Sequence, residues 1–391
     1  MSIKNKFTRR EFLGIGLAGA ASAVLAGKAR AESKEMLLYI GTYTSTGKSE
    51  GIYVYKFDPQ SGKLTALQTV KYVTDPSFLT VSRDRKYLYA VNELLEYEGQ
   101  KTGLVSAFAI DQKTGNLKIL NRQLSLGGAP CFITTSENQK FALVANYLGG
   151  NVSVFPIEKN GQLGTSVDLA QHTGFGPNKD RQEAAHAHSI TLDRSNRFAF
   201  AADLGIDKLM IYRFDDKTGN LTLSETQPFY QTKPGAGPRH FSFHPLGRFA
   251  FLINELDLTI TSLAYDEKKG TLKEIQTVPA LPADAPRAGA TCADIHVSPN
   301  GKFLYGSNRG HNSIVSYRID EKGRLEYIEH TPTGGKKPRN FVIAPAGDFL
   351  LVANQDSDSI VVFRIDEKTG KLQSTGISAN VPAPVCLKLL V

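Results

Sequence analysis

The feature that most constrains this chain is a unit of about 50 residues that recurs from end to end. Each copy contains an apolar, strand-like run that ends in a polar residue, and successive end residues lie 50, 54, 57, 51, 54 and 46 positions apart. The end residues are Thr42, Asn92, Asn146, Asp203, Asn254, Asn308 and Asn354. A fixed period of this length is typical of solenoids and propellers, in which each unit packs only on its neighbours.

One unit divides into four predicted strands, which span residues 239–245, 248–255, 259–266 and 271–278. These runs are rich in Phe, Ile, Leu and Thr and are bounded by turn residues, as strands are. The turn before the fourth strand recurs in other units as DQKTGNL, DDKTGNL and DEKTGKL. Its glycine supplies the positive φ that such hairpins need. No segment shows a sustained helical period, so we expect few helices.

The repeats predict a closed ring. Seven second strands occur, but only six first strands precede them, because the first unit begins at its second strand near Met36. The C-terminal run APVCLKLLV (383–391) resembles the first strand APCFITT (129–135). We therefore predict an all-β, seven-bladed β-propeller of four-stranded antiparallel blades, in which the C-terminal strand completes the N-terminal blade and removes an exposed sheet edge.

The N-terminus carries the pattern of an export signal. TRREFLG (8–14) matches a twin-arginine signal, an apolar stretch follows, and ARA (29–31) is a small-x-small cleavage pattern. The apolar stretch is too short for a stable membrane span. We expect residues 1–31 to be a signal peptide cleaved after export by the twin-arginine translocase, and residues 32–391 to be a single periplasmic propeller domain.

Charge and cysteine content exclude several classes of protein. The formal net charge is +8, but residues 1–31 hold six bases and one acid, so the remainder carries only about +3. No basic run is interleaved with aromatic residues, which argues against nucleic-acid binding. Cys131, Cys292 and Cys386 fall on first strands of three different blades and are expected to be buried thiols rather than a bridge or a zinc site. A closed propeller needs no partner, so we expect a monomer.

Six ionisable side chains are expected at one mouth of the channel. In a blade the first strand is innermost and the second runs antiparallel beside it, so the first strand starts and the second ends at the same rim. Register counting places Ser77, Cys131, His188, Arg239, Ala293, Arg339 and Val385 at the rim of the first strands. The rim positions of the second strands are Tyr43, Glu93, Tyr147, Leu204, Glu255, Arg309 and Gln355.

This group suits hydrolysis or isomerisation of an anionic, oxygen-rich small molecule, because arginine binds carboxylate or phosphate through paired hydrogen bonds. Glu255 beside arginines would stay ionised and act as a general base on water. His188 could share that role or carry the proton to the leaving oxygen. The chemistry needs no metal or other cofactor. The side chains expected to contact the substrate are Arg339, Glu93 and His186.

Other interpretations of these residues stay open. Glu255 with Arg239 or Arg309 could be a structural ion pair, and His186 with His188 could bind a metal. A calcium site would need several converging oxygen ligands, for which the candidates are Asn146, Asp203, Asn254 and Glu255.

Three further predictions concern residues next to this rim. The asparagines that end the second strands are expected to bond backbone groups between blades. His240 should face away from the channel and into the blade packing, because successive strand residues alternate. The long loop 172–188 is a candidate lid or substrate contact.

The chain resembles the propeller lactonase family, which includes bacterial propeller-type 6-phosphogluconolactonases and fungal carboxymuconate lactonising enzymes. The resemblance covers nearly all of residues 36–391. It rests on GPRHFSFHPLGRFAFLINE (237–255), HAHSITLDRSNRF (186–198), VSPNGKFLYGSNRGHNSI (297–314) and LYIGTYT (38–44). It implies a metal-free active site of one histidine, two arginines and one glutamate. By motif these map onto His188, Arg239, Arg309 and Glu255, with His186 as the alternative histidine.

Three functions compete, beside a weaker fourth, a metal-dependent lactonase that would use the calcium ligands named above. The first is a lactonase that opens a sugar-acid lactone, either 6-phosphogluconolactone or an unphosphorylated aldonolactone such as gluconolactone. The second is a muconate-type lactonising cycloisomerase that uses the same residues. The third is a non-catalytic periplasmic binding propeller, against which the clustered ionisable residues argue. Export favours an unphosphorylated substrate, and the fold alone does not decide between the three.

Overall fold

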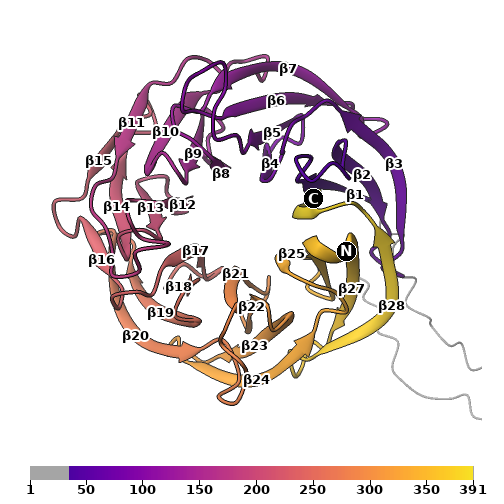
Figure 1. Ribbon diagram of the computed structural model, residues 1–391. Helices are drawn as coiled ribbons and strands as arrows, with labels where there is room; N and C mark the ends of the chain where they lie inside the picture. Colours follow the sequence, from indigo (N-terminus) through magenta and orange to yellow (C-terminus); the bar gives the residue numbers. More distant parts are fainter. Residues whose placement is uncertain (1–34, 391) are drawn as a thin grey trace, which may run out of the picture. The chain divides into compact units, whose positions relative to one another are not determined.

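The computed structural model describes residues 35–390, which form a ring of seven antiparallel sheets around a central channel (Figure 1). The predicted signal segment, residues 1–31, lies outside the described residues. The seven-bladed all-β prediction is confirmed. In one blade the outer position is divided between two short strands, β15 and β16, which both pair with β14.

Six blades run from the channel outward in chain order, and in the seventh the C-terminal strand is innermost. The innermost strands are β4 (Leu79–Val81), β8 (Pro130–Thr135), β12 (Ala187–Leu192), β17 (Pro238–Phe243), β21 (Thr291–Val297), β25 (Pro338–Ile343) and β29 (Pro384–Leu390). The second strands are β1 (Met36–Thr42), β5 (Tyr87–Asn92), β9 (Phe141–Asn146), β13 (Phe198–Asp203), β18 (Phe249–Asn254), β22 (Phe303–Arg309) and β26 (Phe349–Asn354). The third strands are β2 (Gly51–Phe57), β6 (Leu104–Ile110), β10 (Asn151–Pro156), β14 (Lys208–Phe214), β19 (Thr259–Asp266), β23 (Ser313–Ile319) and β27 (Ser359–Ile365). The outer strands are β3 (Leu64–Lys71), β7 (Leu117–Leu124), β11 (Asp168–Gln171), β15 (Leu221–Leu223), β16 (Phe229–Gln231), β20 (Thr271–Pro279), β24 (Leu325–Pro332) and β28 (Leu372–Asn380).

The C-terminal strand closes the ring, as predicted. Strand β29 pairs with β1 in the order β29-β1-β2-β3, with Leu37 opposite Leu390 and Gly41 opposite Cys386. Each innermost strand also contacts the innermost strand of the next blade, all the way round the ring. Chain ends that are far apart in sequence therefore share one sheet, and the ring of blades is closed.

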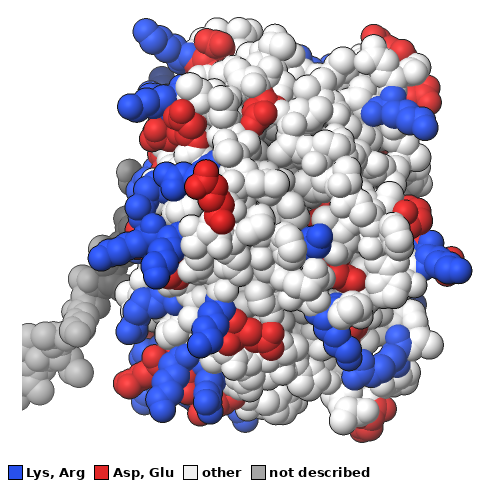
Figure 2. Space-filling view, turned by 90° about the vertical axis from the view of Figure 1, so that its left-hand side faces the viewer, with Lys and Arg blue, Asp and Glu red and all other residues white. Residues whose placement is uncertain are grey.

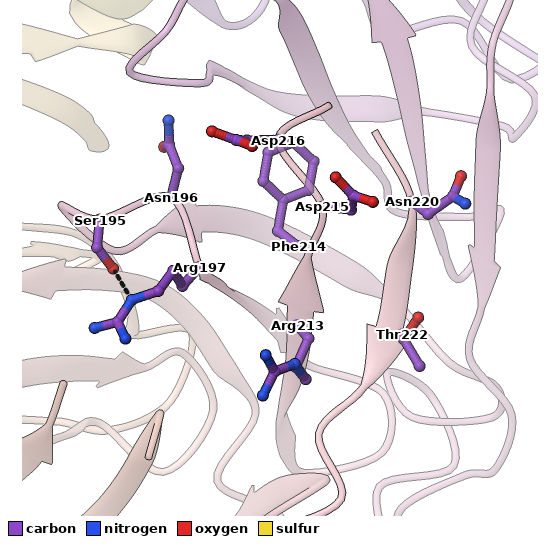
Figure 3. A pocket seen from close by; sticks show the side chains of 9 residues that line it. All are labelled: Ser195, Asn196, Arg197, Arg213, Phe214, Asp215, Asp216, Asn220 and Thr222. Carbon is purple, nitrogen blue, oxygen red and sulfur yellow. Dashed lines mark hydrogen bonds between the residues drawn. The ribbon is translucent and has the colours of Figure 1, made fainter. Parts of the chain in front are cut away.

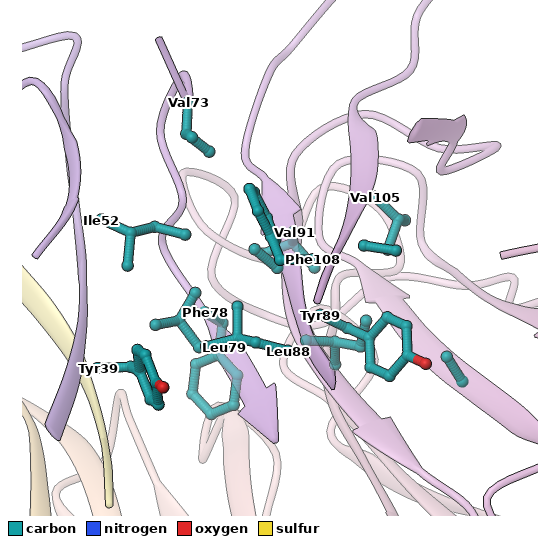
Figure 4. Close-up of a cluster of buried hydrophobic side chains, with 14 of the residues drawn as sticks. Tyr39, Ile52, Val73, Phe78, Leu79, Leu88, Tyr89, Val91, Val105 and Phe108 are labelled. Carbon is teal, nitrogen blue, oxygen red and sulfur yellow. The ribbon is translucent and has the colours of Figure 1, made fainter. Parts of the chain in front are cut away.

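Apolar side chains fill the space between neighbouring blades. Figure 4 shows one such cluster, which joins β1 and β2 to β5 and β6. The hairpin turns that precede the outer strands lock these contacts. Gly270 in one turn has φ +68°, and a Cβ added there would meet the Phe198 ring of the preceding blade at 2.3 Å. Glycine is thus required both for the turn and for the close approach of two blades.

The asparagines that end the second strands mostly tie each blade to the connection that enters it. The Nδ2 groups of Asn92, Asn146, Asn308 and Asn354 donate to backbone carbonyls of these connections. Asn254 instead donates to threonine hydroxyls of its own blade. The only helical turn among the described residues is the 3-10 turn Gln355–Ser357, and no helix there is long and apolar enough to span a membrane.

Candidate active site

A cavity of about 300 Å³ opens at one mouth of the channel, where the first strands start and the second strands end. Its walls come from all seven blades and from the loop 172–188. The lining residues are Tyr43, Glu93, Cys131, Tyr147, Arg181, His188, Glu255, Arg309 and Arg339. A smaller void shares part of this lining, and Arg239 and His240 border it.

Glu255 is the centre of a cluster of three arginines. Its Oε2 accepts from Arg239 Nε at 2.9 Å and from Arg309 Nη2 at 2.8 Å, and its Oε1 accepts from Arg181 Nη2 at 2.6 Å. Glu255 and Arg239 are each 2% exposed. Arg239 Nη1 also donates to the Ala293 carbonyl. Both carboxylate oxygens are therefore engaged, and each guanidinium is fixed in place.

The charges of this cluster shift its pKa values. Burial alone would raise the pKa of Glu255, but Arg309 and Arg239 hold that pKa well below its usual range. Burial, together with Arg309 and Arg339, lowers the pKa of Arg239 to about 10. At neutral pH Glu255 is ionised and Arg239 is charged.

Of the two candidate histidines, His188 faces the cavity. It is 5% exposed, and its Nδ1 lies 3.6 Å from Cys131 Sγ. His186 does not line the cavity, since its Nδ1 bonds the Tyr147 carbonyl and its Nε2 bonds Glu183, each at 3.0 Å. Burial, reinforced by Arg239, holds the pKa of His188 well below its usual range. His188 is therefore a neutral imidazole at pH 7.

A second carboxyl group lines another wall of the cavity. Glu93 follows Asn92 in its blade as Glu255 follows Asn254, but its surroundings differ. Its Oε2 accepts from the Tyr43 hydroxyl at 2.9 Å, and no cation lies within ion-pair distance of it among the described residues. The Arg339 guanidinium lies 5.3 Å from the centre of the Tyr43 ring. Burial raises the pKa of Glu93, and Arg339 only partly offsets this.

β-Bulges place several of these side chains. The ladder between the first two strands skips one residue in each of four blades, and the skipped residues are Cys131, His188, Arg239 and Arg339. A bulge turns two successive side chains towards the same side of the sheet. The predicted orientation of His240 is therefore wrong. Its ring approaches Phe132 and Phe78, which belong to blades across the channel, at 5.3 and 5.9 Å.

These rings form a floor under the cavity. Phe78 stacks on Phe132 with ring centres 4.3 Å apart, and His240 packs edge-on against both. His240 Nδ1 bonds Asp294 at 2.8 Å, and its Nε2 lies 3.1 Å from Arg239 Nη1. Because Asp294 accepts the Nδ1 proton, Nε2 can accept from Arg239. The floor thus supports the arginine cluster.

The long loop 172–188 reaches the cavity through Arg181, which sequence reasoning missed. Gln182 beside it is fully buried and donates to the Leu204 carbonyl and to Asp207, each at 2.8 Å. Asp203 holds both ends of the loop, since it bonds His172 Nδ1 at 2.6 Å and accepts from the backbone NH of His186 at 2.7 Å. The loop is a fixed wall of the cavity in this structure.

The structure brings most of the predicted rim residues to the cavity or to the void that adjoins it. The exceptions are Ala293, Leu204 and Gln355, which line neither. The oxygens weighed as calcium ligands do not share one network: Asp203 bonds the loop and Glu255 the arginines, whereas the Oδ1 atoms of Asn146 and Asn254 have no hydrogen-bond partner among the described residues. No cluster of three or more metal-type ligands occurs among residues 35–390. All three cysteines are free and buried, as predicted.

A larger cavity, of about 480 Å³, lies at the other end of the strands, against β14 and the turns beside it (Figure 3). Figure 3 shows its two arginines, Arg197 and Arg213, pointing away from Asp215 and Asp216 rather than converging with them. It has no histidine in its lining. The side of the molecule seen in Figure 2 mixes basic and acidic side chains, without a continuous basic stripe. The chemistry therefore gathers at the channel mouth.

Fold and site together define a seven-bladed propeller with a positively charged, histidine-containing pocket at one mouth of its channel. Residues 37–389 match the family described as "Lactonase, 7-bladed beta-propeller". The chain belongs to this propeller lactonase family and is a lactone-hydrolysing carboxylic ester hydrolase.

Individual relatives agree over nearly their whole length. The 6-phosphogluconolactonase of Bacillus subtilis is 38% identical over 90% of this chain and 97% of its own. The structure of a putative 6-phosphogluconolactonase from Bacteroides fragilis is 38% identical, with TM-score 0.85 over 92% of this chain and 99% of that one. A periplasmic gluconolactonase from Pseudomonas aeruginosa is 32% identical, with TM-score 0.85 and the same coverage.

Proposed function

We propose that the cavity at the channel mouth hydrolyses the ring ester of sugar-acid lactones, with or without a 6-phosphate. The observation that carries this proposal is the charge of the cavity and its adjoining void: four arginines face only two carboxyl groups, beside a neutral histidine. Such a pocket attracts an oxygen-rich substrate and stabilises negative charge as it develops.

The residues divide the chemistry between them. His188 takes a proton from water as the water attacks the lactone carbonyl. Arg239 and Arg309 stabilise the oxyanion that forms, and Glu255 holds both guanidiniums in position. This departs from the expectation that Glu255 is the base, because both of its oxygens are engaged by arginines. A general base contributes about 10²–10⁴-fold and one oxyanion donor about 10²–10³-fold.

Arg339 is the cation best placed to meet the rest of the substrate. It lines the cavity and pairs with no carboxylate within ion-pair distance among the described residues. It therefore contributes positive charge that the protein does not neutralise locally. We propose that Arg339 binds the hydroxyl-rich or phosphorylated end of the substrate, which would lie between Arg339 and the mouth. His186 supports Tyr147 by ring stacking at 4.5 Å and acts indirectly.

Proton release by the full chain on glucono-1,5-lactone, on its 6-phosphate and on cis,cis-muconate tests this proposal. Rapid release from either sugar lactone supports it, and the ratio of the two kcat/KM values identifies the tail that is recognised. A loss of muconate absorbance without lactone hydrolysis would support the cycloisomerase instead. If the chain acts on none of the three, the binding-propeller interpretation gains and the proposal fails.

We also propose that the enzyme is exported by the twin-arginine translocase and acts in the periplasm as a monomer. The support is the TRREFLG motif and the 32% identity to a protein described as a periplasmic gluconolactonase. Replacing both Arg9 and Arg10 by lysine should keep the uncleaved chain in the cytoplasm. Periplasmic recovery of that variant would contradict the proposed route, and light scattering of the wild type would test the monomer.

A further inference from the structure

The cavity contains two carboxyl groups in opposite environments. In the described part of the chain, arginine side chains form ion pairs with only one of them. Glu255 accepts from three guanidiniums through both oxygens. Glu93 has a single side-chain hydrogen bond among the described residues, at 2.9 Å from the Tyr43 hydroxyl. Two titratable groups whose surroundings separate their protonation divide naturally into different roles in one reaction.

We propose that Glu93 is the general acid that delivers a proton to the ring oxygen of the lactone as the ester bond breaks. This inference rests on the proposed lactonase function and assigns a step that His188 would otherwise have to perform alone. Glu93 lines the cavity beside Arg339 and Cys131 and reaches the smaller void beneath it.

The step balances without a further reactant. His188 removes a proton from water while the water oxygen bonds the carbonyl carbon and the carbonyl oxygen takes the negative charge. When this intermediate collapses, the bond from carbon to the ring oxygen breaks, and the ring oxygen takes the proton of Glu93. The product is the hydroxy acid. The proton on His188 then returns to Glu93 through water in the cavity, and the free acid ionises into solvent.

The groups that face Glu93 support protonation of its carboxyl group. Burial raises its pKa and Asp75 acts in the same direction, whereas Arg339, Ser77 and the Tyr43 hydroxyl oppose the rise. Burial also raises the pKa of Tyr43 and of Cys131, so both stay neutral at pH 7. Glu93 is thus the carboxyl group of this cavity whose protonated form is favoured, as a proton donor requires.

Glu93→Gln keeps the size of the side chain and its acceptor for Tyr43 but cannot donate an acidic proton. On glucono-1,5-lactone we expect kcat to fall about 100-fold with KM changed less than about threefold. The fall in wild-type rate as pH rises through the Glu93 pKa should also disappear. Glu96→Gln, an exposed change in the same loop, is the matched control and should behave as wild type.

The pH dependence of kcat in Tyr43→Phe distinguishes a proton-donating Glu93 from a merely structural one. The hydroxyl stabilises ionised Glu93, so its removal raises the Glu93 pKa and shifts the alkaline fall in kcat to higher pH. If the wild type is active, the role of Glu93 is overturned by a Glu93→Gln kcat within about threefold of the wild-type value, or by a Tyr43→Phe pH profile that does not shift. The proposed lactonase function would stand in that case. An inactive wild type overturns the proposed function, and the role of Glu93 with it.

Discussion

Replacing Glu255 by glutamine should destabilise the propeller as well as damage its site. The change leaves Arg239, Arg309 and Arg181 without their shared anion, and Arg239 is almost fully buried. Breaking a buried ion pair by removing one partner typically costs about 3–5 kcal/mol. With an unfolding entropy of about 2.1 cal/mol/K per residue, a ring of this size should lose roughly 4–7 °C in Tm.

Calorimetry of the variant beside Glu137→Gln separates the cluster from an ordinary ion pair. Glu137 pairs with Arg83 on the surface, where such pairs contribute about 0–1 kcal/mol, so its loss should move Tm by less than about 1–2 °C. Added phosphate should restore part of the Glu255→Gln loss, because an anion can replace the missing carboxylate. Equal Tm values for the two variants would refute the claim that Glu255 holds the arginines.

The ionisation of Glu255 also predicts how the stability of the protein depends on pH. The folded pKa of Glu255 lies below the unfolded value of about 4.3, so its stabilisation is complete above that value and is lost as pH falls through the folded pKa. Wild type should therefore lose Tm in acid more steeply than Glu255→Gln. Parallel Tm curves down to the lowest pH at which both fold would contradict the depressed pKa.

Three further outcomes follow from the structure. Gly270→Ala should lower the free energy of unfolding by about 1–3 kcal/mol, because its Cβ would strike Phe198. Gly247 also has a positive φ but faces open space, so Gly247→Ala should cost about 1 kcal/mol or less. Urea unfolding of the two variants compares these losses. Deleting residues 384–391 removes β29 and should give aggregated protein on gel filtration, and a monodisperse product would refute closure by this strand. Prior treatment with EDTA should leave kcat on glucono-1,5-lactone unchanged, and loss restored by a divalent cation would contradict the proposed metal-free site.

The repeat made the fold and much of the site predictable. A period near 50 residues with a strand ending in Asn fixes the blade count, and a shared register fixes which residues meet at one rim. His188, Arg239, Glu255 and Arg309 could be placed for that reason. Strand counting also predicted that the C-terminus completes the first blade.

The repeat could not place residues that lie in insertions or next to β-bulges, because these interrupt its regular register. Arg181 belongs to an insertion with no counterpart in other blades, so no period positions it. His240 was misassigned because simple alternation fails at a β-bulge. A signal for those bulges was present: proline precedes the skipped residue at Cys131, Arg239 and Arg339, and proline within a sheet is confined to edges, first positions and bulges.

We propose that lactones are hydrolysed at the channel mouth with His188 as the base. The most direct test is proton release from glucono-1,5-lactone by the wild type and by His188→Asn, each shown by calorimetry to be folded. We expect kcat to fall at least about 100-fold in the variant, with Tm within a few degrees of the wild type. A folded His188→Asn enzyme that retains the wild-type kcat would contradict it.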